Sequence, residues 1–553
     1  MKEEKLKITF PDGNTIETAK NTVASELLKN INGQNSRVLA MRLNNKIYSL
    51  EKKIKYSGKI EPVFIDTKDG ANIYRRSLCL LLAAATHRLY PEYQLLVGHS
   101  LGYGYYYTFR NVNKTSDETI FQIEKEMRRM VQQDIPIETD TISYNEATAL
   151  FEKLGLKKTR KQLDFIAAPR VKINAIEDFS DLYFGPLVPS TGALKTFALK
   201  PYGEGFLLRF PASSDHSKLT EFVDEPKLFE IYSKYKKWGQ RIGITAAADL
   251  NELIAKRKIN DFIDITETFQ EKNIAEIADQ IVRKKTVRVV LMAGPSSSGK
   301  TTTSKKLALE LQAMGYAPKV ISLDSYYVDH SRTPKDKDGN FDFECLEALD
   351  IELLNQNLVD LFAGKGVIIP SYDFHNGTQT FDENNKMRLE ENEILIMEGI
   401  HGLNPSLTPK IPAEYKFKIY LSALTQLNLD DHNRIPTSNN RLIRRIVRDY
   451  QFRGKSAAGT IAMWPSVQKG EELHIFPFQN NADAILNTAL DYELSVLKVY
   501  AEPLLRCVTP NEPEYSEACM LLSFLDNFAT IAPTQVPVRS IIREFIGGSA
   551  FHY

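Results

Sequence analysis

The sequence predicts a multidomain protein of mixed α/β and α+β class. It begins with a small β-grasp module, continues with an α+β domain and has a parallel-sheet domain towards its C-terminus. Three observations predict this. At 553 residues the chain is longer than one hydrophobic core normally supports. Its first residues alternate apolar and polar side chains in the β manner. Further on, a short apolar run leads into a glycine-rich loop and a helical pattern.

Changes in sequence pattern divide the chain into five expected regions. Each boundary follows a change in hydrophobic periodicity, from alternation to helical spacing or back. The regions are a β-grasp module at 1–67, an α+β domain at 68–225, a helical connector at 226–285, a phosphate-binding domain at 286–505 and a helical tail at 506–553.

Within the first two regions the elements follow from pattern. Leu6, Ile8 and Phe10 alternate along a strand that ends at a turn. The later patterns predict a helix over 23–28, strands over 38–43 and 60–65, helices over 73–90 and 118–133, and an aromatic-rich strand over 103–109.

Charge and cysteine content narrow the classes of function. Seventy basic and seventy acidic residues cancel, so the whole chain has no field that would hold nucleic acid or an acidic membrane. A local RNA contact stays open at Lys157–Lys161, although a solvated turn is the favoured interpretation. The scattered cysteines indicate reduced thiols, and the absence of a signal peptide or of an apolar run near ~20 residues predicts a cytoplasmic protein with no membrane partner.

The strongest motif is a phosphate-binding loop. The apolar strand expected at Val287–Ala293 feeds directly into GPSSSGKT, which is GxxxxGK[ST] between a strand and a helix. Lys300 is positioned to reach the β and γ phosphates of ATP, and Thr301 to ligate Mg²⁺. The residues expected to bind ATP are Gly294, Pro295, Ser296, Ser297, Ser298, Gly299, Lys300, Thr301 and Thr302.

Two carboxylates are expected at the same edge of the sheet. Glu398 ends an apolar strand and is a candidate metal ligand, while Asp324 ends another expected strand, over 320–324, and is a candidate general base. The alternatives are an edge-strand glutamate in water and a turn-capping aspartate. No Asn-Lys-x-Asp motif follows, which argues against a GTPase.

A helix candidate carries five arginines. Arg441, Arg444, Arg445 and Arg448 share one broad helical face, and Arg453 follows. Such a cluster can form a movable lid that stabilises charge during phosphoryl transfer. A solvated charged face is the alternative.

Residues 285–490 resemble the uridine kinase and phosphoribulokinase family through GPSSSGKTT, SLDSYY, NFDFECLEALD, IPSYDF, IMEGI, RLIRRIVRD and NADAILN. The resemblance implies an ATP- and Mg²⁺-dependent kinase. It implies Asp324 and Lys300 as catalytic residues and Thr301 and Glu398 at the metal. The substrate contacts that we expect are Tyr327, Asp342, Tyr372, His375 and Arg441, and the expected lid residues are Arg445, Arg448 and Arg453.

One departure concerns the acceptor. Uridine kinases typically place a base-contacting histidine five residues after the YDF tyrosine, where this chain has Gly377; His375 lies three residues after it. The acceptor favoured by the resemblance is a pyrimidine nucleoside, uridine or cytidine, converted to its 5′-monophosphate. A sugar, polyol or sugar phosphate is the alternative, because the histidine is missing at position 377. Residues 398–405 are also more similar to phosphoribulokinases than to uridine kinases.

The first 225 residues resemble threonyl-tRNA synthetase, with its TGS domain over 1–66 and its editing domain over 68–225. RRSLCLLLAAATHRLYP, GYYYTF and GPLVPSTG carry the likeness. The editing HxxxH and CxxxH pairs fall on Arg76, Leu80, Tyr183 and Leu187, so we expect no editing chemistry. A third hypothesis is therefore an ATP-switched regulator that binds tRNA or the ribosome through residues 1–225. A homo-oligomer stays open.

Overall fold

The computed structural model describes residues 5–29, 37–110, 112–335, 339, 341–373, 376–390 and 392–552. The chain forms two compact units. Unit 1 comprises Met1–Lys256, Gln426–Pro436 and Glu502–Thr530, and unit 2 comprises Arg257–Thr425, Thr437–Ala501 and Ile531–Tyr553. The unit boundaries pass through the predicted connector, the predicted phosphate-binding domain and the predicted tail. The two units are described separately below.

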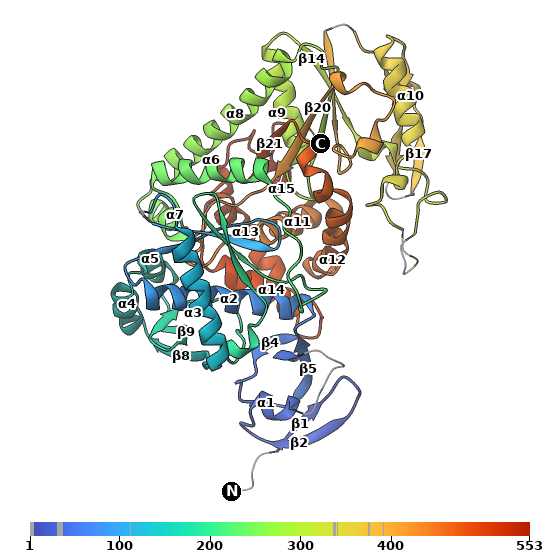
Figure 1. Ribbon diagram of the computed structural model, residues 1–553. Helices are drawn as coiled ribbons and strands as arrows, with labels where there is room; N and C mark the ends of the chain where they lie inside the picture. The colour runs from blue at the N-terminus through green and yellow to red at the C-terminus, as the bar shows by residue number, and fades with distance from the viewer. Residues whose placement is uncertain are drawn as a thin grey trace. The chain divides into compact units, whose positions relative to one another are not determined.

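Unit 1 starts with the β-grasp module. Its five-stranded sheet has the order β2-β1-β5-β3-β4 and packs on one short helix, and the buried Ile8, Leu43 and Ile60 belong to its core (Figure 1). The elements are β1 Lys5–Thr9, β2 Thr15–Ala19, α1 Ala24–Leu28, β3 Val38–Leu43, β4 Lys46–Ser49 and β5 Gly58–Phe64.

The second part of unit 1 is built around α2, whose apolar middle is buried on all sides by helix α3 and neighbouring strands. Two antiparallel sheets belong to it, with the orders β11-β12-β7-β6 and β10-β9-β8. The elements are α2 Lys68–Leu89, β6 Leu95–Ser100, β7 Gly104–Phe109, α3 Asp117–Gln133, β8 Glu138–Ser143, α4 Tyr144–Lys153, α5 Lys157–Ile166, β9 Arg170–Ile176, β10 Phe179–Asp181, β11 Ala198–Tyr202 and β12 Gly205–Arg209.

The basic run at Lys157–Lys161 is the start of helix α5, so its interpretation as a solvated turn is wrong. Lys158 Nζ lies 2.7 Å from the Asp249 carboxylate, and Lys161 Nζ lies 2.5 Å from that of Glu252. Carboxylates of the same unit therefore neutralise this run, which weakens it as a contact for RNA phosphates.

Unit 1 also includes a segment from far along the sequence, Gln426–Pro436, which is here named the inserted segment. Asn428 accepts a hydrogen bond from the backbone N–H of Ala247 at 2.8 Å, and its side-chain amide donates to the carbonyl of Val97. Because backbone and side chain are both bonded, the segment has a defined place in this unit. The remaining helices of unit 1 are α6 Pro226–Ile242, α7 Ala247–Ala255 and α14 Tyr515–Leu525.

Unit 2 is built on a five-stranded sheet of order β14-β19-β13-β20-β21, in which every pair is parallel. The predicted class, multidomain with a C-terminal P-loop domain on a parallel sheet, is confirmed. Its strands are β13 Val289–Ala293, β14 Ala317–Ser322, β19 Glu393–Glu398, β20 Lys416–Ser422 and β21 Ala484–Asn487. Its helices are α8 Ile259–Arg283, α9 Lys300–Ala313, α10 Ile351–Phe362, α11 Thr437–Arg453, α12 Ala457–His474 and α15 Arg543–Ile546. Helix α13 Glu493–Arg506 belongs to unit 2 as far as Ala501.

Two small antiparallel pairs complete unit 2. They are β15 Val367–Ile368 with β18 Lys386–Met387, and β16 Ser371–Asp373 with β17 Thr378–Thr380. Among the residues described in both units, no helix is long and apolar enough to cross a membrane.

Candidate active site

The phosphate-binding loop joins the carboxyl end of β13 to the start of α9. Its backbone takes left-handed angles at Ser297, with φ of 58°, and at Gly299, with φ of 82°. A Cβ atom at Gly294 would lie 2.5 Å from the carbonyl oxygen of Leu421, so only glycine fits at that position. The sequence prediction of a strand, a loop and a helix is confirmed, and the helix N-terminus favours an anion at the loop.

Two side chains at the start of α9 point back to the loop and to the sheet edge. Lys300 Nζ donates to the carbonyl of Gly294 at 3.0 Å, so the ammonium is held over the loop. The Thr301 hydroxyl lies 3.3 Å from a carboxylate oxygen of Glu398. A hydroxyl and a carboxylate oxygen are ligands that suit Mg²⁺, so these residues fit the metal that the sequence predicts.

Glu398 is the last residue of β19 and is 7% exposed. Burial raises the pKa of its carboxyl to about 7; Lys300 and Thr301 act against this rise, and the negative charges of Asp324 and Glu544 add to it. An unpaired buried carboxylate is costly, so the site is built to receive positive charge.

Asp324 lies two residues beyond the end of β14, in a short 3-10 turn. The surrounding protein raises the pKa of its carboxyl, while Lys300, Arg453 and Arg448 oppose the rise. Its side chain is accessible to solvent, and water limits this effect. An accessible carboxylate near the loop lysine has the placement expected of a general base.

A third carboxylate, Glu344, was not singled out from the sequence. Burial raises the pKa of Glu344 to about 7, and Glu471 and Asp324 add to the rise while Arg445 and Lys300 oppose it. These neighbours place Glu344 within the same charged cluster. The only available signal was its position two residues after Asp342, in the motif NFDFECLEALD.

Two of the helix α11 arginines are bonded to the loop backbone. Arg441 Nε donates to the carbonyl of Ser296 at 2.9 Å, and its guanidinium pairs with Glu471. Arg444 is fully buried and bridges the carbonyl of Ser297, at 3.1 Å, to the carboxylate of Glu493. These contacts fix the loop from outside the phosphate site.

The next three arginines surround Asp449. Arg448 lies 2.9 Å from its carboxylate and Arg453 3.7 Å, and Arg445 pairs with it while also donating to the Ser296 hydroxyl at 2.7 Å. Arg453 is half exposed. The assignment of Arg445, Arg448 and Arg453 to a lid stays a prediction.

The expected acceptor side is an aromatic wall. The rings of Tyr327 and Tyr372 lie 5.5 Å apart, and the Tyr327 hydroxyl donates to the carbonyl of Phe343. Asp342 accepts a hydrogen bond from the backbone N–H of Glu344 at 3.0 Å. His375 lies outside the described residues.

His330 lies beside Gly377, the position at which uridine kinases typically have a histidine. Gly377 has φ of 66°, and a Cβ atom there would lie 2.1 Å from Nδ1 of His330. The backbone N–H of His330 also donates to the Gly377 carbonyl at 2.9 Å. The His330 ring stacks on Phe341 at 4.7 Å. An imidazole therefore occupies the space that a side chain at 377 would fill.

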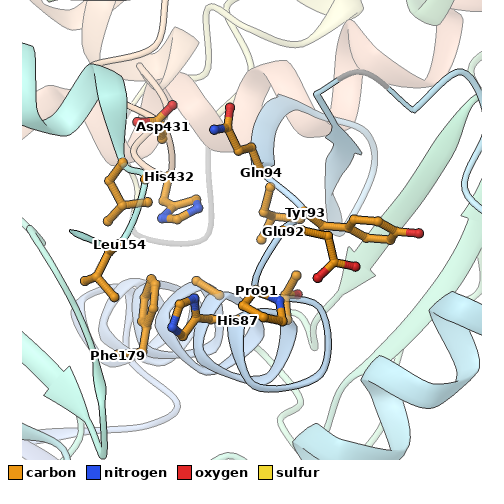
Figure 2. Close-up of a pocket in the computed structure, with 14 residues that line it drawn as sticks. His87, Pro91, Glu92, Tyr93, Gln94, Leu154, Phe179, Asp431 and His432 are labelled. Atoms are coloured by element: carbon orange, nitrogen blue, oxygen red, sulfur yellow. The ribbon is translucent and has the colours of Figure 1, made fainter. Parts of the chain in front are cut away.

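In unit 1, apolar and bulky side chains fill the four predicted editing positions. Arg76 is bonded to the carbonyl of Pro186 at 2.8 Å, while Leu80, Tyr183 and Leu187 are buried in the core. Nearby, a pocket of about 200 Å³ is lined by His87 and by His432 of the inserted segment (Figure 2). Phe179 packs against both imidazoles, with ring centroids at 5.4 and 6.0 Å.

A P-loop, two strand-end carboxylates and an arginine helix on a parallel sheet define unit 2 as a phosphotransferase of the P-loop kinase class. Residues 289–495 match the Phosphoribulokinase / Uridine kinase family, so this part of the chain is a domain of that family.

Two solved structures resemble the chain weakly. A possible uridine kinase from Bacillus stearothermophilus has 20% identity and a TM-score of 0.27, and it matches 39% of this chain and 98% of its own. D-glycerate 3-kinase from Cryptococcus neoformans has 14% identity and a TM-score of 0.23, with 50% and 87% covered.

The other part of the chain is similar to threonine--tRNA ligases. That of Carboxydothermus hydrogenoformans is 32% identical over 196 residues, which are 35% of this chain and 31% of the ligase. That of Listeria welshimeri is 35% identical over the same shares. The chain thus spans less than a third of the length of these relatives.

Proposed function

We propose that this protein transfers the γ-phosphoryl group of ATP to the hydroxyl of a pyrimidine nucleoside, with Mg²⁺ as the metal. The observation that carries the kinase reaction is the grouping of Lys300, Asp324 and Glu398, whose charges influence one another at the carboxyl edge of the sheet. An ammonium, an accessible carboxylate and a buried carboxylate at a phosphate loop supply the groups that phosphoryl transfer requires.

The residues have distinct roles in the proposed reaction. Asp324 accepts the proton of the acceptor hydroxyl while that oxygen bonds to the γ-phosphorus and the bond to ADP breaks. Lys300 stabilises the charge on the phosphate oxygens. Thr301 and Glu398 would hold Mg²⁺, which supplies charge neutralisation between the phosphates.

A nucleoside acceptor is supported by the aromatic wall and by His330. A flat base can lie against Tyr327 and Tyr372, which form one ring pair. His330 presents an imidazole beside Gly377, where the resemblance expects a histidine that contacts the base. This placement favours a nucleoside over a sugar or polyol, which has no flat base to stack on the wall.

A turnover panel tests the proposal. The full chain with ATP and Mg²⁺ is assayed for ADP release on uridine, cytidine, adenosine, fructose, glycerate, glycerol and ribulose 5-phosphate. We expect uridine and cytidine to give the highest kcat/KM. Turnover of a sugar or polyol without any nucleoside would keep the kinase reaction but overturn the acceptor, and no turnover of any acceptor in the panel would count against both.

A further inference from the structure

Unit 1 contains a large cavity that belongs to neither the kinase site nor the former editing positions. Its volume is about 780 Å³, within the range of small-molecule sites. Aromatic side chains form much of its wall, namely Tyr106, Phe109, Phe229 and Tyr232. The rest of the lining comes from β6, β7, α5 and α6, from loop residues at 110, 112–113, 203–204 and 243–246, and from the inserted segment Gln426–Pro436. Its acidic members are Glu204, Asp430 and Asp431.

Lys236 is the notable cation in this cavity. Its Nζ atom donates to the Thr108 hydroxyl at 3.1 Å and lies 5.5 Å from the ring centre of Tyr106 and 5.7 Å from that of Tyr232. Within the described part of the chain, no carboxylate lies within ion-pair distance of it. Burial lowers the pKa of Lys236 to about 8, with Glu204 acting weakly against the shift.

The other cations of the lining are already compensated. Arg110 lies 3.6 Å from a carboxylate oxygen of Asp431, Lys158 is paired with Asp249, and Lys237 lies 3.5 Å from Glu204. Lys236 therefore differs from its neighbours in having only a neutral hydroxyl and two ring faces. A desolvated cation in that setting attracts an anion.

Gln426 supplies a second polar group that the protein leaves unused. Neither the oxygen nor the nitrogen of its side-chain amide has a hydrogen-bond partner among the described residues, although both are buried. Unsatisfied buried polar groups are costly, and Gln426 is one of the residues that line the cavity. An amide that offers both a donor and an acceptor matches the edge of a heterocyclic base.

We propose that this cavity binds a small organic anion built on a flat heterocyclic ring. The anionic group pairs with Lys236, and a polar edge of the ring bonds to Gln426. The ring itself lies against the aromatic side chains that line this cavity. A nucleoside monophosphate and a heterocyclic carboxylate share this chemistry. The site is independent of the kinase proposal, since it lies wholly in unit 1.

Lys236 can be trapped directly in the full chain. Its neutral amine adds to the aldehyde of pyridoxal 5′-phosphate with loss of water, and borohydride reduces the imine to a stable secondary amine that peptide mass spectrometry locates. Inorganic tripolyphosphate, which has no ring, is present throughout to cover Lys300. We expect Lys236 to be modified at least about tenfold faster than the exposed Lys234 of the same helix.

Competitors then separate the features of the ligand. Uridine monophosphate carries the ring and a phosphate, orotate the ring and a carboxylate, inorganic phosphate no ring, and uridine no anion. We expect the first or second to protect Lys236 at least about tenfold better than the last two, and the better of them identifies the anionic group. Equal protection by all four, or no preference for Lys236 over Lys234, would overturn the proposal.

Variants keep the result independent of the labelling chemistry. Equilibrium dialysis measures uridine monophosphate and orotate binding to Lys236→Met, Lys236→Arg and the control Lys234→Met, again with tripolyphosphate present. Lys236→Met should lose binding at least about tenfold, while Lys236→Arg and Lys234→Met retain it. Unchanged binding by a Lys236→Met protein with normal melting behaviour would also overturn the proposal.

Discussion

Nδ1 of His432 lies 2.6 Å from a carboxylate oxygen of Asp181, and both side chains are buried within unit 1. Burial by itself lowers the pKa of His432, but Asp181, with Asp431 and Asp430 adding to it, outweighs burial, so the pKa is raised. The imidazolium is therefore the form that this site stabilises. His432 belongs to the inserted segment, whose chain continues at Thr437 into the arginine helix α11.

Asp181→Asn should destabilise unit 1 at about pH 6 by about 3 kcal/mol, because it leaves a buried cation unpaired. A raised histidine pKa contributes stability that is fully present below the unfolded value of about 6.5 and is lost as pH rises through the folded value. The difference between wild type and variant should therefore shrink by about pH 9. Urea unfolding at both pH values measures it, with Asp178→Asn as an exposed control. An equal difference at both pH values would contradict the charged pair.

The elements that sequence predicted best are those whose pattern is local. Strand β3 matches its predicted range, helix α3 begins one residue before it, and the loop from Gly294 to Thr301 follows from a motif and its flanks. Periodicity and turn chemistry act over a few residues, so they can be read without knowing the fold. The strand end before Asp324 was placed two residues late, because a short 3-10 turn keeps the same apolar pattern.

The features of the site that could not be predicted from the sequence depend on contacts between residues far apart in the chain. His330 and Gly377 are far apart in the chain, and only the fold places the imidazole where a Cβ would be. Likewise, no local pattern distinguishes Arg444, which is buried and bonded to the Ser297 carbonyl, from Arg448, which pairs with Asp449. Both arginines satisfied the same helical spacing.

Asp324→Asn should lower kcat by at least about 100-fold, because the amide cannot accept the proton of the acceptor hydroxyl. ATP affinity should change less than about threefold, since the loop contacts stay intact. Steady-state turnover and nucleotide titration give the two quantities. Glu347→Gln, an exposed carboxylate in the same unit, is the matched control. Near-normal turnover by Asp324→Asn would exclude this residue as the base.

Glu398 predicts a pH dependence of the Mg²⁺ requirement. Its carboxyl has a pKa of about 7 without metal, so protons compete increasingly with Mg²⁺ below that value. The Mg²⁺ concentration for half-maximal rate should rise by up to about tenfold per pH unit below about pH 7 and be flat above it. The Glu398→Gln variant should need more Mg²⁺ at every pH and show no such bend.

The raised pKa of Glu398 also predicts how the stability of the metal-free protein changes with pH. A carboxyl whose folded pKa is raised contributes stability below its unfolded value of about 4.5, and this contribution is lost as pH rises through about 7. Between about pH 5 and pH 8 the melting temperature of metal-free wild type should fall more than that of Glu398→Gln. Identical profiles for the two proteins would contradict the buried, uncompensated carboxyl.

His330→Ala should raise the KM for the acceptor by about tenfold or more with a smaller change in kcat, because it removes a contact with the base but no group at the reacting atoms. Gly377→His alone should misfold this corner, since its Cβ would collide with the imidazole. In the double variant His330→Ala, Gly377→His the collision is removed, and KM should fall back towards the wild-type value. Initial rates on uridine and cytidine decide this, and a normal KM in His330→Ala would contradict the assignment.

Arg444 and Arg453 should separate loop support from charge stabilisation. Arg444→Met leaves Glu493 and the Ser297 carbonyl without their cation in a buried site, so we expect a loss of about 3 kcal/mol in stability together with weakened ATP binding. Arg453→Met removes a half-exposed cation whose charge reaches Asp324, so kcat should fall about tenfold or more while the melting temperature stays within about 2 °C. Thermal unfolding and turnover of both variants measure this contrast. If Arg453→Met were fully active, the lid assignment of this residue would be wrong, whereas a stable Arg444→Met protein would refute its structural role.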